Sequence, residues 1–145
     1  MKRISLVSVI LFAMSVSAFS QIGVSSYSVY SLGVNTSKEK KISGELKSFF
    51  NRGDIEYTQF ELAGMYNFNA KEYHQFSVGL GLNVAPFVGF DHVQSFVFPI
   101  AQLEIFPFQN FKQLSLVIEI APEWIVEDNL NIRHLWGFRY TFKRN

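Results

Sequence analysis

The chain has 145 residues, no cysteine and a formal net charge of +1. This length fits one domain, the lack of cysteine excludes a disulfide framework and a lipid-anchoring cysteine, and the near-neutral charge provides no field that would attract nucleic acid. Hydrophobic residues make up 48% of the chain and charged residues 17%, whereas soluble domains carry about 25% charged residues. The sixteen phenylalanines therefore need an extensive apolar environment.

Residues 1–20 have the features of a cleavable signal peptide. Lys2 and Arg3 precede an apolar run over residues 4–16, and the segment ends in Ala-Phe-Ser, which places small residues at the positions that a signal peptidase reads. The apolar run is shorter than the roughly 20 residues that a spanning helix needs. We therefore expect an exported protein whose single domain covers residues 21–145.

After residue 20, apolar and polar residues alternate in seven stretches, which is the pattern of strands with one apolar face. In chain order the stretches cover 22–34, 41–51, 58–68, 73–86, 93–106, 113–124 and 131–142. The short breaks between them, at 35–40, 52–54, 69–72, 87–92, 107–112 and 127–129, fit hairpin connections. The sequence therefore predicts an all-β fold of antiparallel strands.

Two of these stretches are irregular. Residues 22–34 alternate least clearly and are too short for two spanning strands, so they are read as one strand. This reading gives seven strands, whereas single-chain membrane barrels usually have an even number, so either a pair has been merged, a strand is missing, or the sheet does not close in a membrane. In 93–106 the apolar face begins with Phe96, Phe98 and Ile100 and then shifts by one residue to include Leu103 and Ile105. The shift predicts a β-bulge within residues 99–102, where proline is tolerated.

The last stretch, 131–142, has one face that is almost wholly apolar and aromatic. Trp136, Phe138 and Tyr140 fall on this face, while Arg139 falls on the other. Such a strand separates two environments, and its aromatic face must meet either a protein core or lipid. Aromatic residues also gather beside the predicted breaks, as in the aromatic girdles of membrane barrels.

The opposite, polar faces carry charged residues in the middle of strands. An arginine on a lipid-facing surface at the bilayer midplane costs roughly 2–4 kcal/mol, so these side chains are expected to point inward. Because unpaired buried charges are severely destabilising, we expect one ion-pair network that fills a barrel and leaves no wide pore. The predicted members of this lumen network are Glu45, Lys47, Glu61, Glu119, Arg133 and Arg139.

Hairpin geometry predicts individual contacts within this network. A turn centred near Asn129 would place Glu119 opposite Arg139, which predicts an ion pair between them. By the same reasoning, Glu45 and Glu61 would face each other across the break at 52–54, with Lys47 diagonal to Glu61.

The chain ends in Gly-Phe-Arg-Tyr-Thr-Phe before three further residues, and Gly137, Tyr140 and Phe142 resemble the terminal signal for insertion of outer-membrane barrels. The signal segment ending in Ser-Gln, the turn Asn-Ala-Lys-Glu-Tyr and the strand Phe-Ser-Val-Gly-Leu-Gly-Leu-Asn add to this likeness. The chain after residue 20 resembles the small outer-membrane β-barrel proteins of the OmpA and OmpX type, and the porin-like barrels of Bacteroidetes. The resemblance implies an antiparallel up-and-down transmembrane β-barrel of eight strands, with outer-membrane lipid and the barrel assembly machinery as partners.

A structural or surface-interaction role in the outer membrane is therefore the leading prediction. The alternative is a soluble periplasmic barrel of the lipocalin type, whose interior would hold a small apolar ligand. The low content of charged residues disfavours this alternative, because a soluble barrel needs more lysine and glutamate on its outer face.

The sequence offers little that points to catalysis. The three histidines do not stand at metal-ligand spacing, so no metal or other cofactor is expected. Asp91, His92 and Ser95 have the residue types of an acyl-transfer site, as in the lipid A palmitoyltransferase barrel, but a solvated loop is favoured. Glu45 and Glu61 have the residue types of a glycosidase carboxylate pair, but the neighbouring Lys47 favours a structural ion pair. The protein is predicted not to be an enzyme.

Overall fold

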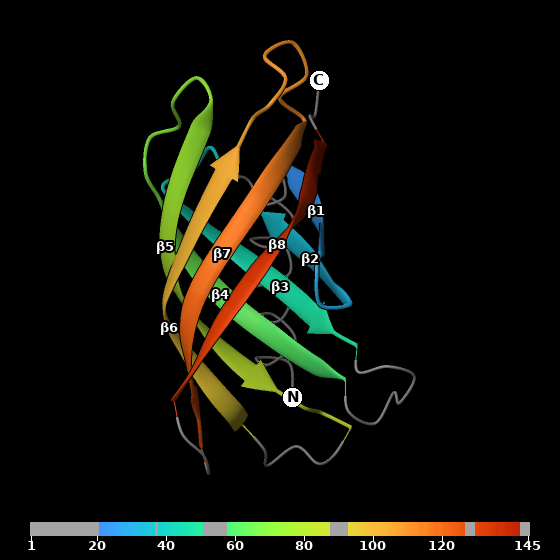
Figure 1. Cartoon of the computed structure of the whole chain (residues 1–145), viewed down its shortest axis with the longest axis vertical. Coiled ribbons are helices and arrows are strands. Elements are labelled where there is room, and N and C mark those ends of the chain that lie inside the picture. The colour runs from blue at the N-terminus through green and yellow to red at the C-terminus, as the bar shows by residue number, and fades with distance from the viewer. Residues whose placement is uncertain (1–20, 37, 51–57, 88–92, 127–129, 143–145) are drawn as a thin grey trace, which may run out of the picture.

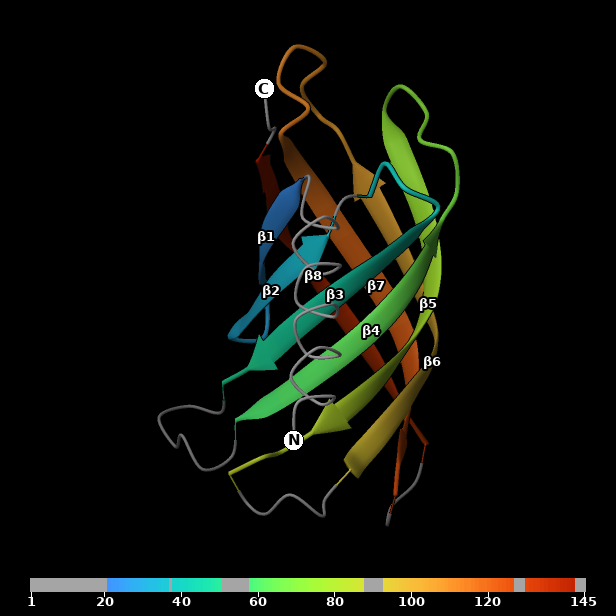
Figure 2. The same ribbon diagram turned by 180° about the vertical axis from the view of Figure 1, so that it is seen from behind.

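The computed structural model describes residues 21–36, 38–50, 58–87, 93–126 and 130–142. These residues form a closed barrel of eight antiparallel strands, in which each strand pairs with its neighbours in sequence and β8 pairs with β1 (Figures 1 and 2). The strands are β1 (Ile22–Tyr27), β2 (Ser31–Thr36), β3 (Ile42–Phe49), β4 (Gln59–Asn67), β5 (His74–Val84), β6 (Val93–Ile105), β7 (Leu114–Ile125) and β8 (Leu130–Phe142). Among the described residues, no helix is long and apolar enough to cross a membrane.

The eight strands include a hairpin that the alternation pattern did not reveal. The stretch 22–34, predicted as a single strand, contains β1 and most of β2, which have six residues each. Tyr30 in the turn between them has a φ of 39°, a left-handed conformation in which glycine or asparagine is usual. The odd count of strands came from this merged pair, which the sequence did not separate because neither of these residues marks the turn.

The two ends of the barrel differ in the chain segments that they hold. The terminal end is the one at which β1 begins and β8 ends, and it carries the turns β2–β3, β4–β5 and β6–β7 (Figure 1). The opposite end, which we name the distal end, carries the other four connections. β1 pairs with β8 only between Gly137 and Phe142, so β8 extends beyond the β1–β2 hairpin toward the distal end.

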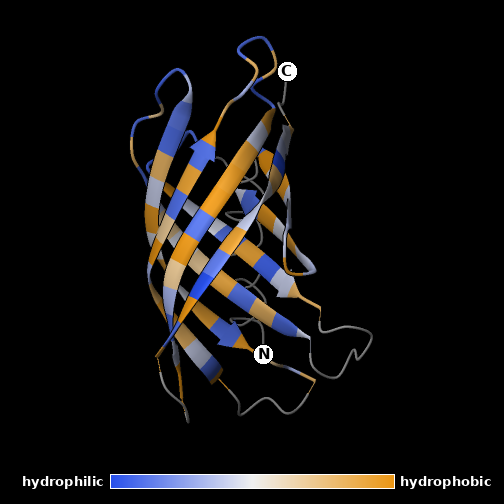
Figure 3. Cartoon of the chain, in the orientation of Figure 1, coloured by the Kyte–Doolittle hydropathy of each residue, from blue (hydrophilic) through white to orange (hydrophobic). Residues whose placement is uncertain are grey.

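Outside the irregular part of β6, side chains alternate between the two surfaces of the barrel wall. Apolar and polar residues follow one another along the strands in Figure 3, as the sequence predicts. On β5, for example, Phe76 and Leu80 are exposed on the outside, while Gln75, Ser77 and Asn83 are buried inside. The barrel is therefore apolar outside and polar inside, the reverse of a soluble globular protein.

The predicted bulge in β6 is confirmed, and it changes the position of one side chain. The pairing of β6 with β7 shifts between Val97 and Ala101. Val97 and Ile100 are both fully buried, while Phe98 between them is exposed. The placement of Ile100 on the outer face with Phe98 was therefore wrong, because the frame changes before Ile100 and not after it.

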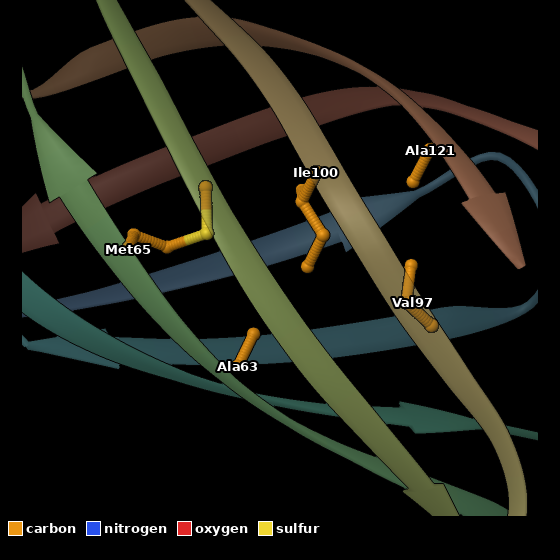
Figure 4. Close-up of a cluster of buried hydrophobic side chains, with 5 residues drawn as sticks. All are labelled: Ala63, Met65, Val97, Ile100 and Ala121. Carbon is orange, nitrogen blue, oxygen red and sulfur yellow. The ribbon is translucent and has the colours of Figure 1, made fainter.

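Apolar side chains occupy only small parts of the interior. One cluster lies where β4, β6 and β7 face each other (Figure 4). A second cluster contains Tyr27, Val117 and Leu135, with Phe49 packed against it. The members of the first cluster are Ala63, Met65, Val97, Ile100 and Ala121.

Candidate functional site

The interior of the barrel holds every charged residue of the described strands. No Asp, Glu, Lys or Arg of these strands lies on the outer face, and the charged residues that the structure describes outside the strands lie in turns at the terminal end. Seven of the eight charged strand residues form ion pairs with one another. The charged strand residues are Glu45, Lys47, Glu61, Glu104, Glu119, Glu123, Arg133 and Arg139.

Four of these residues form a closed ring of alternating charge toward the distal end, which we name the distal ion cluster. Lys47 Nζ lies 2.8 Å from Glu61 Oε1 and 2.7 Å from Glu119 Oε2. The Arg133 guanidinium spans the same two carboxylates, at 2.5 Å from Glu61 Oε2 and 2.9 Å from Glu119 Oε1. Both carboxylates are therefore bound by both cations, and Lys47 Nζ also reaches the second oxygen of Glu119, Oε1, at 2.8 Å. The ring joins β3, β4, β7 and β8.

A second group, the terminal ion cluster, is centred on Arg139. The Arg139 guanidinium lies 2.8 Å from Glu45 Oε1 through Nη2 and 2.8 Å from Glu104 Oε2 through Nη1. Its Nε donates to Ser25 Oγ at 2.8 Å, and Nη2 also donates to the Tyr27 hydroxyl at 3.1 Å. Tyr27 in turn donates to Glu45 Oε1 at 2.5 Å. This cluster joins β1, β3, β6 and β8, and so it holds the closure of the barrel.

Gln102 connects the two clusters. Its amide nitrogen donates to Glu45 Oε2 at 3.2 Å and to Glu119 Oε2 at 3.0 Å. Its amide oxygen accepts from Lys38 Nζ at 2.9 Å and from Arg139 Nη1 at 3.3 Å. All four hydrogen-bonding positions of this buried amide are therefore satisfied, and the interior forms one continuous polar network.

Lys38 closes the network at the terminal end. It lies in the β2–β3 turn, and its side chain is buried against Gln102. Burial, together with the nearby Arg139 guanidinium, lowers the pKa of the Lys38 ammonium from its ordinary 10.5 to about 8. With Lys38, the network contains four cations and balances the four carboxylates of Glu45, Glu61, Glu104 and Glu119.

The structure thus brings the six residues singled out in the sequence into the two ion clusters, but some of the predicted pairs are wrong. In the last hairpin Glu119 lies opposite Leu135, and Arg139 lies opposite Ser115. Glu119 therefore contacts Lys47 and Arg133, and Arg139 finds its carboxylates on β3 and β6. The predicted turn centre, near Asn129, lies outside the described residues.

The hairpin of β3 and β4 also has a different register from the predicted one. Lys47 lies directly opposite Glu61, and Glu45 lies opposite Ala63. This register is better than the predicted one, because it sets a cation against a carboxylate instead of two carboxylates against each other. Both Glu45 and Glu61 are held by cations, so neither stands as one of a free carboxylate pair.

Sequence reasoning missed several members of the network, including Ser25 of β1, which accepts a hydrogen bond from Arg139. Gln102 and Glu104 follow the frame shift in β6, and their inward direction could have been read from the outward Leu103 and Ile105. Tyr27 was hidden because β1 and β2 were merged. Lys38 lies in a turn, where no periodicity indicates the direction of a side chain.

The other candidates for chemistry find little support among the described residues. Ser95 Oγ donates to Glu123 at 2.5 Å and accepts from Asn83 at 2.8 Å. Asp91 and His92, the other members of the suggested acyl-transfer group, lie outside the described residues, as does the predicted signal peptide at 1–20. In the part of the chain that the structure describes, no cluster of His, Asp and Glu suits a metal ion.

The three residues that resemble an assembly signal lie on β8, at its closure with β1. Gly137 pairs with Tyr27, Tyr140 with Val24 and Phe142 with Ile22. Tyr140 and Phe142 face outward, and their rings contact each other with centroids 4.9 Å apart. Their role in assembly stays a prediction.

Comparison of the chain with protein-family models, with curated proteins and with solved structures found no match. The likeness to small outer-membrane barrels therefore depends on the residues quoted above and on the shape of the barrel.

Proposed function

We propose that the protein is a small integral outer-membrane β-barrel with a structural or surface-interaction role. The observation that carries this proposal is the distribution of polarity: charged strand residues lie inside, and the outer face is apolar. Soluble monomers rarely expose contiguous apolar patches larger than a few hundred Å². Here exposed apolar side chains occur on all eight strands, and lipid is the environment that suits such a surface.

Aromatic and charged side chains at the barrel ends support the same proposal. Tyr66, Phe68 and Phe76 form a chain of ring contacts toward the terminal end, and Phe60 contacts Phe87 toward the distal end. Lysines of the terminal turns, among them Lys71, lie beyond the apolar surface. Aromatic and basic residues in these positions match the two interfaces of a membrane.

The length of the strands and the pairing of the backbone are also relevant. β4 to β8 have 9 to 13 residues, which agrees with the roughly 9–11 residues of a tilted spanning strand. β1 and β2 are shorter, but their turn exposes the side chains of Val29 and Tyr30 and is hydrogen-bonded to both neighbouring strands. The Ser28 amide donates to the Trp136 carbonyl at 2.8 Å, and the Phe50 amide donates to the Tyr30 carbonyl at 3.0 Å. These bonds satisfy polar groups that lipid cannot.

The filled interior favours a structural or surface role over transport. Arg139, Lys47, Glu61 and Glu119 are all less than 2% exposed and occupy the middle of the barrel. A soluble barrel with an apolar ligand would need the opposite arrangement, with an apolar interior and a charged exterior. In the proposed setting, outer-membrane lipid contacts the outer face and the barrel assembly machinery inserts the chain.

The substitution Leu80→Arg tests the proposal. Leu80 is 62% exposed in the middle of β5. In lipid, an arginine at this depth costs roughly 2–4 kcal/mol, so we expect the amount of folded protein in the outer membrane to fall severalfold. On the surface of a soluble barrel the same change is almost neutral.

Glu72→Arg is the matched control, because Glu72 is exposed in the β4–β5 turn beyond the apolar surface. The proposal predicts that this variant accumulates like the unchanged protein. Equal accumulation of the Leu80→Arg and Glu72→Arg variants would contradict it.

A further inference from the structure

A cavity opens inside the distal end of the barrel, next to the turn of the short β1–β2 hairpin. Its volume is about 310 Å³, which is at the lower end of the roughly 300–1,000 Å³ range of small-molecule sites. Val29 of the hairpin turn contributes to its wall, together with residues of β4 to β8. The space exists because β7 and β8 continue past the point at which β1 and β2 end.

Polar side chains in the cavity wall retain unused capacity for hydrogen bonds. Among the described residues, Asn83 and Ser95 donate hydrogen bonds to Glu123, and both bonds end on Oε1. The other carboxylate oxygen, Oε2, can therefore accept a further hydrogen bond. Among the described residues, Asn83 Oδ1 and Arg133 Nε have no hydrogen-bond partner. Buried polar atoms without partners are costly, and a bound molecule that offers both donors and acceptors can reduce this cost.

The charges in the wall favour a neutral ligand. Glu123 disfavours an anion, and Arg133, which is fixed by Glu61 and Glu119, disfavours a cation beside it. The remaining polar groups are planar amides, including those of Gln59 and Gln94, which bond to each other at the cavity wall. A neutral ligand with several hydroxyl groups fits these donors and acceptors without introducing an unpaired charge.

Aromatic rings complete the wall. Phe50 is 47% exposed and presents an apolar surface at the cavity. The neighbouring Phe49 also lines the cavity, and the Arg133 guanidinium lies over its ring at 5.2 Å from the centroid. A sugar ring has one face of C–H groups and a rim of hydroxyl groups, so it matches an aromatic surface flanked by planar polar side chains.

We propose that this distal cavity binds a neutral saccharide unit of about the size of one monosaccharide. In the bound state the apolar face of the sugar packs on Phe50, and its hydroxyl groups bond to Glu123 and to the amides of the wall. The site is formed by interior and distal residues, so it does not depend on what surrounds the outer face of the barrel.

Saturation-transfer NMR on the purified full chain in amine-oxide micelles tests this proposal, since this headgroup is not a sugar. The probes are D-glucose, N-acetyl-D-glucosamine, choline and acetate. We expect transfer to the ring protons of at least one of the two sugars, and stronger transfer to it than to choline or acetate. No transfer to either sugar, or stronger transfer to a charged probe than to both sugars, would overturn the proposal.

Variants then locate the binding. Phe50→Ala and Glu123→Leu are each expected to reduce the transfer at least fivefold, because they remove the stacking surface and the main acceptor. Phe111→Ala is the matched control, as Phe111 is similarly exposed, at 44%, but lies at the terminal end. If both cavity variants reduced the transfer less than fivefold, or if Phe111→Ala reduced it as much as they do, the sugar would bind elsewhere and the assignment to this cavity would be overturned.

Discussion

Burying the charge of Arg139 inside this barrel costs free energy, yet the carboxylates around it need this cation. Its guanidinium is fully buried and bonds to Glu45, Glu104, Ser25 and Tyr27. Taking a charge out of water costs several kcal/mol, and only partners with good geometry offset this cost. Arg139 has such partners on three other strands, so removing it leaves two carboxylates without their main cation.

We therefore expect Arg139→Met to lower the free energy of unfolding by about 3–5 kcal/mol, the usual effect of breaking a buried ion pair. Urea unfolding in micelles, followed by tryptophan fluorescence, measures this change. The triple variant R139M/E45Q/E104Q removes the uncompensated charges as well, so it should recover most of the loss. If the triple variant is no more stable than R139M, uncompensated charge does not explain the effect.

Lys38 makes a separate prediction about pH. Its pKa is about 8 in the folded protein and about 10.5 in an unfolded chain, so the unfolded state binds more protons between these two values. The free energy of unfolding should therefore contain a contribution that rises with pH between pH 8 and 10.5. Lys38→Met removes the titrating group and should reduce the rise measured by urea unfolding at pH 7.5 and 9.5. The same rise in both proteins would contradict the assignment.

At the scale of elements, the closure of β8 on β1 depends on a close approach of two backbones. A Cβ atom on Gly137 would collide with the Ser26 carbonyl oxygen and lie 2.8 Å from Tyr27 Cα. The strands meet here because Tyr27 sends its ring inward, opposite the residue that has no side chain. Gly137 therefore has a steric reason to be glycine, apart from any role in assembly.

We predict that Gly137→Ala destabilises the barrel by about 1–3 kcal/mol, the usual cost of overpacking. The free energy of unfolding is measured after refolding without assembly machinery, so that recognition of a signal cannot contribute. Gly64→Ala is the control, because a Cβ at Gly64 has no atom within 4 Å. Equal stability of the two variants would show that the closure tolerates a side chain at Gly137.

The faces of the strands could be predicted from the sequence, whereas the contacts between strands could not. Alternation assigns Glu119 and Arg139 to the interior in both the predicted and the observed register. The two registers differ by an even number of residues, and such a shift preserves the face on which each side chain lies. The identity of the partner depends on turn geometry and on barrel closure. Arg139 and Glu45 are 94 residues apart, and no local pattern relates them. The β1–β2 hairpin was missed because its turn lacks the usual residues.

At the scale of the whole molecule, the balance of charge inside explains how so polar an interior can be stable. Four cations and four carboxylates are joined through Gln102 into one network, which links six of the eight strands through side chains, namely β1, β3, β4, β6, β7 and β8, in addition to the backbone ladders. Outside, the exposed residues of the strands are mostly apolar, and the polar exceptions, Ser26, His74, Asn131 and His134, carry no carboxylate, ammonium or guanidinium group. This inside-out arrangement of the closed barrel supports the proposed location in a membrane.

Outer-membrane fractionation after expression in a Gram-negative host, followed by electrophoresis of unheated and heated samples, tests this claim most directly. If the protein is a membrane barrel, its band is expected in the outer-membrane fraction. The unheated protein should migrate as a compact species, and heating should change its migration, because a closed barrel resists unfolding by detergent until it is heated. A soluble periplasmic band whose migration does not change on heating would contradict it.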